Sequence, residues 1–210
     1  MTDEFRRPAQ FGGREFEAFA GRELDPAALM RTAHQTAHAL LARARDSDDP
    51  EVVERLVSYT DDHGIDALAE LWARSSPHSL PGALWRIYLI RVLIRQDPDG
   101  IALLFQRGTE VLSTIDPVVA GTPLPAGPEE VTELADRILR GVFDGDFAIA
   151  LERAAAFCRV TAAGALSVAD DQDAVSPDRA TELTTRAQRL ITTADELMAC
   201  ARMSRAQTLD

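Results

Sequence analysis

The chain has 210 residues, of which 46% are hydrophobic and 27% charged, and its formal net charge is −12. A chain of this length can bury a hydrophobic core that needs no metal or disulfide to stay folded. Because its negative charge repels phosphate backbones, we expect no nucleic-acid partner. All 22 basic residues are arginines, and the absence of lysine and asparagine excludes lysine Schiff bases, P-loop or kinase lysines, and N-glycosylation.

Residues 1–24 form a phenylalanine-rich arm that holds half of the eight phenylalanines, namely Phe5, Phe11, Phe16 and Phe19. Aromatic side chains in such a polar segment pack either onto the parent domain or onto another chain. The second alternative predicts that these four phenylalanines bind a partner or a second copy. The arm lacks an apolar signal core, and no stretch reaches the roughly 18 apolar residues of a membrane span. We therefore expect a cytoplasmic protein without membrane contact.

Four dipeptides predict helix starts, because each puts a capping side chain directly before a proline. They are Asp25-Pro26, Asp49-Pro50, Asp97-Pro98 and Ser176-Pro177. Gly127-Pro128 predicts a fifth start, because two glutamates follow it in the first helical turn. Asp97 with Asp99 superficially resembles the start of a calcium loop, but the later ligand positions lack oxygen side chains, so we interpret Asp97 as an N-cap.

Apolar residues recur with helical spacing along most of the chain, and no convincing strand or internal repeat appears. Beside a helix that starts at Pro98, the predicted helices cover residues 26–45, 50–62, 65–72, 83–95, 129–142, 147–163 and 177–203. Residues 115–128 are rich in proline and predict an extended connection, which either separates two helical subdomains or carries the chain across the bundle, and residues 170–173 predict a loop. We expect an all-α fold, in which residues 25–210 form one bundle of about seven to nine helices.

The segment 83–94 differs from the other predicted helices because ten of its twelve residues are apolar. Only Arg86 and Arg91 interrupt it, so the segment has no polar face. A helix that is apolar all round belongs in the middle of a bundle or in a membrane, and this one is too short and too charged for a membrane. We therefore predict that the helix over 83–95 is the buried centre of the bundle, enclosed on every side.

The arginines of this central helix give a first candidate site. Arg91 and Arg95 share one helix face with Tyr88 between the same turns, and Trp85 lies nearby. A buried guanidinium has to meet a carboxylate or an anionic ligand. One alternative is an internal salt bridge. The other is a ligand-binding pocket between helices, which Trp85, Tyr88, Arg91 and Arg95 would line.

Two histidines of the first predicted helix are weak candidates for metal ligands. His34 and His38 are four residues apart and share one helix face. No HExxH or Glu-x-x-His motif supplies a third ligand. The apolar stripe centres on Ala33 and Ala37, so His34 lies at its edge and His38 nearer to solvent. We expect ordinary surface histidines, no bound metal and no cofactor.

No catalytic motif is evident. The 42-residue separation of Cys158 and Cys200 fits no zinc or redox motif, so both are expected to be buried thiols. The stretch Asp61-Asp62-His63-Gly64 fits the end of a helix better than acid–base chemistry. There is no Gly-x-Ser-x-Gly elbow and no glycine-rich phosphate loop.

Two stretches carry a resemblance to a known group of proteins. Residues 78–91, which contain Pro81-Gly82 and Trp85-Arg86, are one, and residues 141–159, with Asp146-Phe147-Ala148, are the other. They resemble an uncharacterised all-helical family of GC-rich actinobacteria. The resemblance covers most of the chain, implies an all-helical fold and implies no established activity, so it supplies no catalytic residues.

Two functional hypotheses follow. The first is a non-enzymatic helical module that acts through protein contacts, as a homodimer or as a regulatory partner. It rests on the missing catalytic motifs and on the phenylalanine-rich arm. The alternative is a small-molecule-binding, anion-binding or catalytic bundle with a pocket at Tyr88, Arg91 and Arg95.

Overall fold

The structure is a computed structural model that describes residues 26–45, 71–121 and 127–210. The described residues form seven helices and no strand, which confirms the predicted all-α class. The helices are α2 (Pro26–Arg45), α5 (Leu80–Gln96), α6 (Pro98–Val111), α7 (Asp116–Ala120), α8 (Pro128–Asp144), α9 (Phe147–Gln172) and α10 (Pro177–Arg205). The arm, the predicted helix over 50–62 and most of the one over 65–72 lie outside the described residues.

The predicted helix starts at Pro26, Pro98, Pro128 and Pro177 are all confirmed. The capping interactions behind them differ. The Asp97 carboxylate accepts the Gly100 N–H at 3.0 Å, as an N-cap should, so the calcium-loop interpretation is rightly discarded. At the start of α8 the Glu130 carboxylate accepts the N–H of Gly127 at 2.9 Å. The Ser176 hydroxyl makes no capping bond, so the proline alone marks the start of α10.

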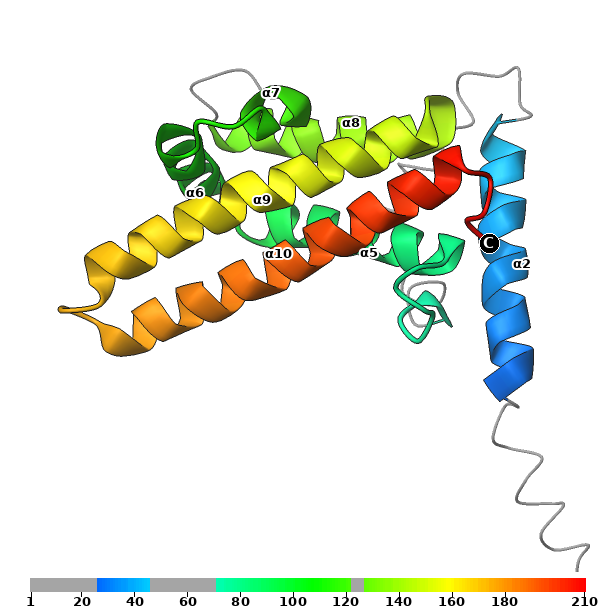
Figure 1. The fold of residues 1–210 in the computed structure, drawn as a ribbon, viewed down its shortest axis with the longest axis horizontal. Helices are drawn as coiled ribbons and strands as arrows, with labels where there is room; N and C mark the ends of the chain where they lie inside the picture. The colour runs from blue at the N-terminus through cyan, green and yellow to red at the C-terminus, as the bar shows by residue number, and fades with distance from the viewer. Residues whose placement is uncertain (1–25, 46–70, 122–126) are drawn as a thin grey trace, which may run out of the picture.

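The helices α9 and α10 form a long antiparallel hairpin that runs through the bundle (Figure 1). Most of α9 is buried, because it contacts α10 and α6 along its length and α7, α8 and α5 elsewhere. The prediction that α9 ends near residue 163 and that 170–173 form a loop is wrong: the helix continues to Gln172. Ala165 and Ala169 extend the buried stripe, and Arg107 of α6 pairs with Asp171 at 2.8 Å, which offsets the charge at this helix end.

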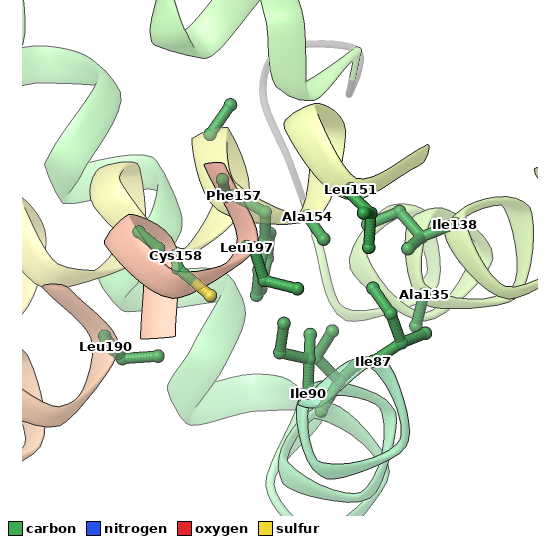
Figure 2. Close-up of a cluster of buried hydrophobic side chains, with 14 of the residues drawn as sticks. Ile87, Ile90, Ala135, Ile138, Leu151, Ala154, Phe157, Cys158, Leu190 and Leu197 are labelled. Carbon is green, nitrogen blue, oxygen red and sulfur yellow. The ribbon is translucent and has the colours of Figure 1, made fainter. Parts of the chain in front are cut away.

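Helix α5 begins at Leu80, three residues earlier than predicted, because the Ser79 hydroxyl accepts the Gly82 N–H at 3.2 Å. Its inner side chains, such as Ile87 and Ile90, meet α8, α9 and α10 in the core (Figure 2). The prediction that this helix is enclosed on every side is wrong on one flank, because Leu89 is 43% exposed. Helix α10 covers α5 only in part. The centre of the bundle is therefore α9, which is mostly buried and contacts helices on all sides.

Helices α6 and α9 approach each other so closely that their backbones leave no room for a side chain between them. A Cβ added to Gly164 of α9 would lie 1.8 Å from the Leu104 carbonyl oxygen of α6. A Cβ added to Gly108 of α6 would lie 1.9 Å from the Val160 carbonyl oxygen of α9. The two backbones are therefore in direct contact, and only glycine fits at both positions.

The proline-rich stretch 115–128 is not extended throughout, as predicted, because residues Asp116–Ala120 form the short helix α7. Arg159 of α9 donates two hydrogen bonds to the Asp116 carboxylate and so fixes α7 on α9. Gly121 ends α7 with a φ of 74°, a conformation that favours glycine. The crossover is thus tied to α9 at its start, and residues 122–126 lie outside the described residues.

No helix in the described ranges combines the length and the apolar character needed to cross a membrane.

Candidate functional site

One candidate site among the described residues is an open groove of about 670 Å³ between α5 and the first half of α10, called the α5–α10 groove below. It lies where α10 leaves the flank of α5 uncovered. Pockets of this volume bind small molecules or single side-chain clusters of a partner. The groove is lined by Leu89, Ile90, Val92, Leu93 and Gln96 of α5 and by Thr181, Glu182, Thr185, Arg186, Arg189, Leu190 and Thr193 of α10.

The threonines of the groove add little polarity to it. The hydroxyls of Thr181, Thr185 and Thr193 each donate to the carbonyl oxygen four residues earlier in α10, at 2.9 Å in every case. Their donors are thus used inside the helix. Together with the leucines, isoleucine and valine of α5, they make the groove mainly apolar.

Arginines supply the charge at the groove. Arg186 lies 3.8 Å from the Asp97 carboxylate through Nη1, and its Nε is buried without a hydrogen-bond partner among the described residues. A buried N–H without an acceptor is costly, so this atom favours an incoming acceptor. Arg189 adds a second positive charge, and Glu182 adds one negative charge. The groove therefore suits an apolar group that is flanked by carboxylates.

The arginines that the sequence singled out on α5 lie beside Asp136 of α8. Arg91 is only 5% exposed, and its Nε lies 3.2 Å from Asp136 Oδ1. Arg95 Nη2 lies 3.7 Å from the same oxygen. The internal salt bridge, one of the two alternatives for these residues, is therefore what the structure shows. A ligand-binding role stays a prediction, and neither arginine lines the α5–α10 groove.

The aromatic pair of the predicted pocket is present on α5. Trp85 and Tyr88 stack with ring centroids 5.6 Å apart, and both side chains are half-buried. Arg86 pairs with Glu196 of α10 and donates to the Gly82 carbonyl at 3.0 Å. Arg86, the charged residue in this part of α5, is therefore paired with other groups of the same chain.

Three residues with metal-ligand chemistry meet where α2 passes the end of the chain. His34 and His38 lie on α2, as predicted, with His34 partly buried and His38 more exposed. Their ring nitrogens and an Asp210 carboxylate oxygen all lie within 4.8 Å of one another. The third ligand that the sequence pattern lacked is thus supplied by Asp210, 172 residues after His38.

Both cysteines are buried free thiols, as predicted. Burial raises the pKa of Cys158 to about 12, and it raises the pKa of Cys200 to about 11. Neither thiol forms the thiolate that nucleophilic or redox chemistry requires near neutral pH. The cysteines therefore act as part of the core.

The predicted partner-binding residues Phe5, Phe11, Phe16 and Phe19 lie outside the described residues, as do Asp61 to Gly64. The comparisons with known proteins add no relative: no family model, no curated protein and no solved structure matches this chain. The resemblance to an actinobacterial family stays a prediction. Function therefore has to be argued from the geometry of the described residues.

Proposed function

We propose that this protein is a non-enzymatic helical module that acts through protein contacts, and that the α5–α10 groove receives the phenylalanine-rich arm of a second copy. The observation that carries this proposal is the uncovered flank of α5. Leu89 is 43% exposed on a helix whose opposite side is core, and the adjoining groove is mainly apolar. Exposed apolar surface of this kind, rimmed by polar residues, is typical of interaction sites.

The chemistry of the arm matches the groove. Phe16 is flanked by Glu15 and Glu17, and the groove has Arg186 and Arg189 beside an apolar floor. An aromatic anchor in an apolar pocket, with opposite charges at the rim, is a common arrangement of interface hot spots. A quarter of the Arg186 side chain is exposed, so its guanidinium can also pair with a carboxylate of the arm.

The position of α2 supports a second copy as the source of the arm. The 25 residues before Pro26 span up to about 80 Å when extended, so they are long enough to leave the parent molecule. In Figure 1 the Pro26 end of α2 projects beyond the edge of the bundle, away from the first half of α10. An exchange of arms between two copies produces a closed, symmetric dimer.

The alternative of a ligand pocket at Tyr88, Arg91 and Arg95 has less support. Asp136 already lies beside both arginines, so an anionic ligand would have to displace this carboxylate. The cytoplasmic location that we propose agrees with the two free thiols, because reducing compartments keep cysteines unpaired.

The proposal is tested by light scattering of the intact chain over a range of concentrations. We expect twice the monomer mass of 22.9 kDa for the intact chain, and the monomer mass after deletion of residues 1–22 or after Leu89→Glu. Leu103→Glu is the matched control, because Leu103 is 61% exposed on α6 outside the groove, and this variant should remain dimeric.

Mixing the two defective proteins identifies the occupant of the groove. The arm-deleted protein keeps its groove, and the Leu89→Glu protein keeps its arm, so the mixture should form a heterodimer held by one arm. A monomeric intact chain overturns the proposal, because the arm then docks on its own domain or on another protein. A dimer that survives both Leu89→Glu and the deletion overturns it as well.

A further inference from the structure

We propose that His34, His38 and Asp210 form a binding site for a divalent transition-metal ion of the zinc type, which fastens α2 to the end of the chain. The inference is independent of the proposed dimer, because none of the three residues lies in the α5–α10 groove. It rests on the ligand atoms, on the way the backbone holds Asp210, and on the low number of competing ligands.

The distances between the ligand atoms suit one tetrahedral ion. His38 Nε2 lies 3.1 Å from Asp210 Oδ1, and His34 Nδ1 lies 3.8 Å from the same oxygen. In a tetrahedron with zinc–ligand bonds of 2.0–2.1 Å, neighbouring ligand atoms are about 3.3 Å apart. The two distances to Asp210 bracket this value, and the two ring nitrogens lie within 4.8 Å of each other, so rotations of the side chains can bring all three atoms onto one ion.

The residue types indicate which ions fit. Two imidazoles and one carboxylate suit zinc and the neighbouring divalent transition metals, whereas calcium and magnesium prefer sites made only of oxygen atoms. Three protein ligands also leave the fourth tetrahedral position for water, because the Asp210 side chain is exposed. Zinc is therefore the first ion to test.

The backbone brings Asp210 to α2 by a defined turn. Gln207 ends α10 with a φ of 56°, and its N–H donates to the Ser204 carbonyl at 3.0 Å. The Thr208 N–H donates to the Met203 carbonyl at 2.9 Å. This pair of bonds is a Schellman motif, which reverses the chain after a helix. The turn occurs here without the usual glycine.

Two further contacts hold the segment after this turn in place. Leu209 packs against the core, and the Leu80 N–H donates to the Asp210 carbonyl at 2.8 Å. The backbone of Asp210 is thus fixed at the start of α5. On the other side, Trp72 Nε1 donates to Thr36 Oγ1 at 3.2 Å, between the two histidines of α2. Preorganised ligands on both sides lower the entropic cost of binding an ion.

Among the described residues, few other nitrogen or sulfur ligands compete for the ion. Cys158 and Cys200 are buried, and their raised pKa values keep them protonated. The chain has four histidines, and His78 is the one among the described residues that lies outside the cluster. Variants of His34, His38 and Asp210 therefore separate binding at this cluster from binding elsewhere on the chain.

The test is isothermal titration of the intact, tag-free protein with zinc chloride, with native mass spectrometry to count the ions. We expect one zinc ion per chain, and a loss of affinity of at least about tenfold in each of His34→Gln, His38→Gln and Asp210→Asn. His78→Gln is the matched control and should bind zinc as the wild type does. All three affected side chains are partly or fully exposed, so the metal-free variants should keep the wild-type Tm.

A second measurement tests the fastening of α2 to the chain end. Zinc should raise the Tm of the wild type and of His78→Gln, because an ion that binds only the folded state stabilises it, and it should raise the Tm of Asp210→Asn clearly less. The inference is overturned if the wild type retains no zinc in this titration, or if His78→Gln weakens binding as much as His34→Gln does.

Discussion

Helices α6 and α9 are in direct backbone contact, whereas helices α5 and α10 leave an open groove between them. Gly108 and Gly164 bring the backbones of α6 and α9 into direct contact and leave no room for a Cβ at either position. Between α5 and α10, leucines and threonines keep the helices further apart, and a groove of about 670 Å³ remains. The first contact is closed along the backbone, and the second leaves apolar surface, which is where we propose that a partner docks. The small size of Gly108 and Gly164 is therefore what allows α6 and α9 to pack more tightly than α5 and α10.

The largest expected effect comes from breaking the close contact. Gly164→Ala puts a methyl group against the backbone of α6, which cannot yield as a side chain would, so we expect a loss of about 3 kcal/mol in the free energy of unfolding. Urea unfolding followed by circular dichroism measures it.

Gly141→Ala is the matched control for this substitution. Gly141 also lies within a helix, but a Cβ there would meet the Ala150 Cβ at an ordinary 3.5 Å. Because alanine has the higher helix propensity, we expect a gain of up to about 1 kcal/mol. Equal effects of the two substitutions would mean that α6 and α9 are not in backbone contact.

The next effect concerns the other flank of α5, where Asp136 lies beside Arg91 and Arg95. Asp136→Ala removes the carboxylate beside the buried Arg91 and should cost about 2 kcal/mol, less than for a fully buried pair because Asp136 is a quarter exposed. Arg91→Met removes the buried charge itself and leaves Asp136 with Arg95, so we expect a change below about 1 kcal/mol.

Thermal unfolding of both variants compares the two costs. A larger loss for Arg91→Met than for Asp136→Ala would show that the guanidinium makes other essential contacts. Such a result would favour a structural role for Arg91, whereas a loss of ligand binding in Arg91→Met would favour the ligand-pocket alternative.

The sequence predicted those features of the fold that are set locally. The start of α6 follows from Pro98 and the capping Asp97, the start of α10 follows from Pro177, and the helical class follows from the periodicity of the apolar residues. The end of α9 was not predictable in this way. Asp170 and Asp171 resemble loop residues, and the interaction of Asp171 with Arg107, 64 positions earlier, belongs to the tertiary structure.

The candidate sites were less predictable than the helices. The apolar segment 83–94 indicated a buried helix, but nothing in its pattern showed that α10 would leave the flank at Leu89 uncovered. His34 and His38 were visible as a pair, whereas Asp210 joins them only after the turn at Gln207. A site whose ligands come from opposite ends of the chain has no signature in local spacing.

The smallest expected effect concerns the ion pair between Glu152 of α9 and Arg205 of α10, at the open end of the hairpin. Arg205 donates there to both carboxylate oxygens of Glu152. These hydrogen bonds and the positive charge of Arg205 hold the pKa of Glu152 below its ordinary value of 4.5. Partial burial raises this pKa, but by less than the interactions with Arg205 lower it. A carboxylate with a lowered pKa stabilises the fold above its ordinary value, and this contribution disappears as the pH falls through the lowered pKa.

Arg205→Gln should therefore lower the Tm slightly at neutral pH, and the difference from the wild type should shrink below pH 4.5 as Glu152 becomes protonated. The thermal unfolding of both proteins, measured across this pH range at low and at high salt, tests the expectation. Because the pair is exposed, salt should reduce the difference at neutral pH, in contrast to the Gly164→Ala effect, which has no charge to screen. Curves that fall in parallel with pH would show that Arg205 does not set the ionisation of Glu152, and the contact at this end of the hairpin would then rest on packing alone.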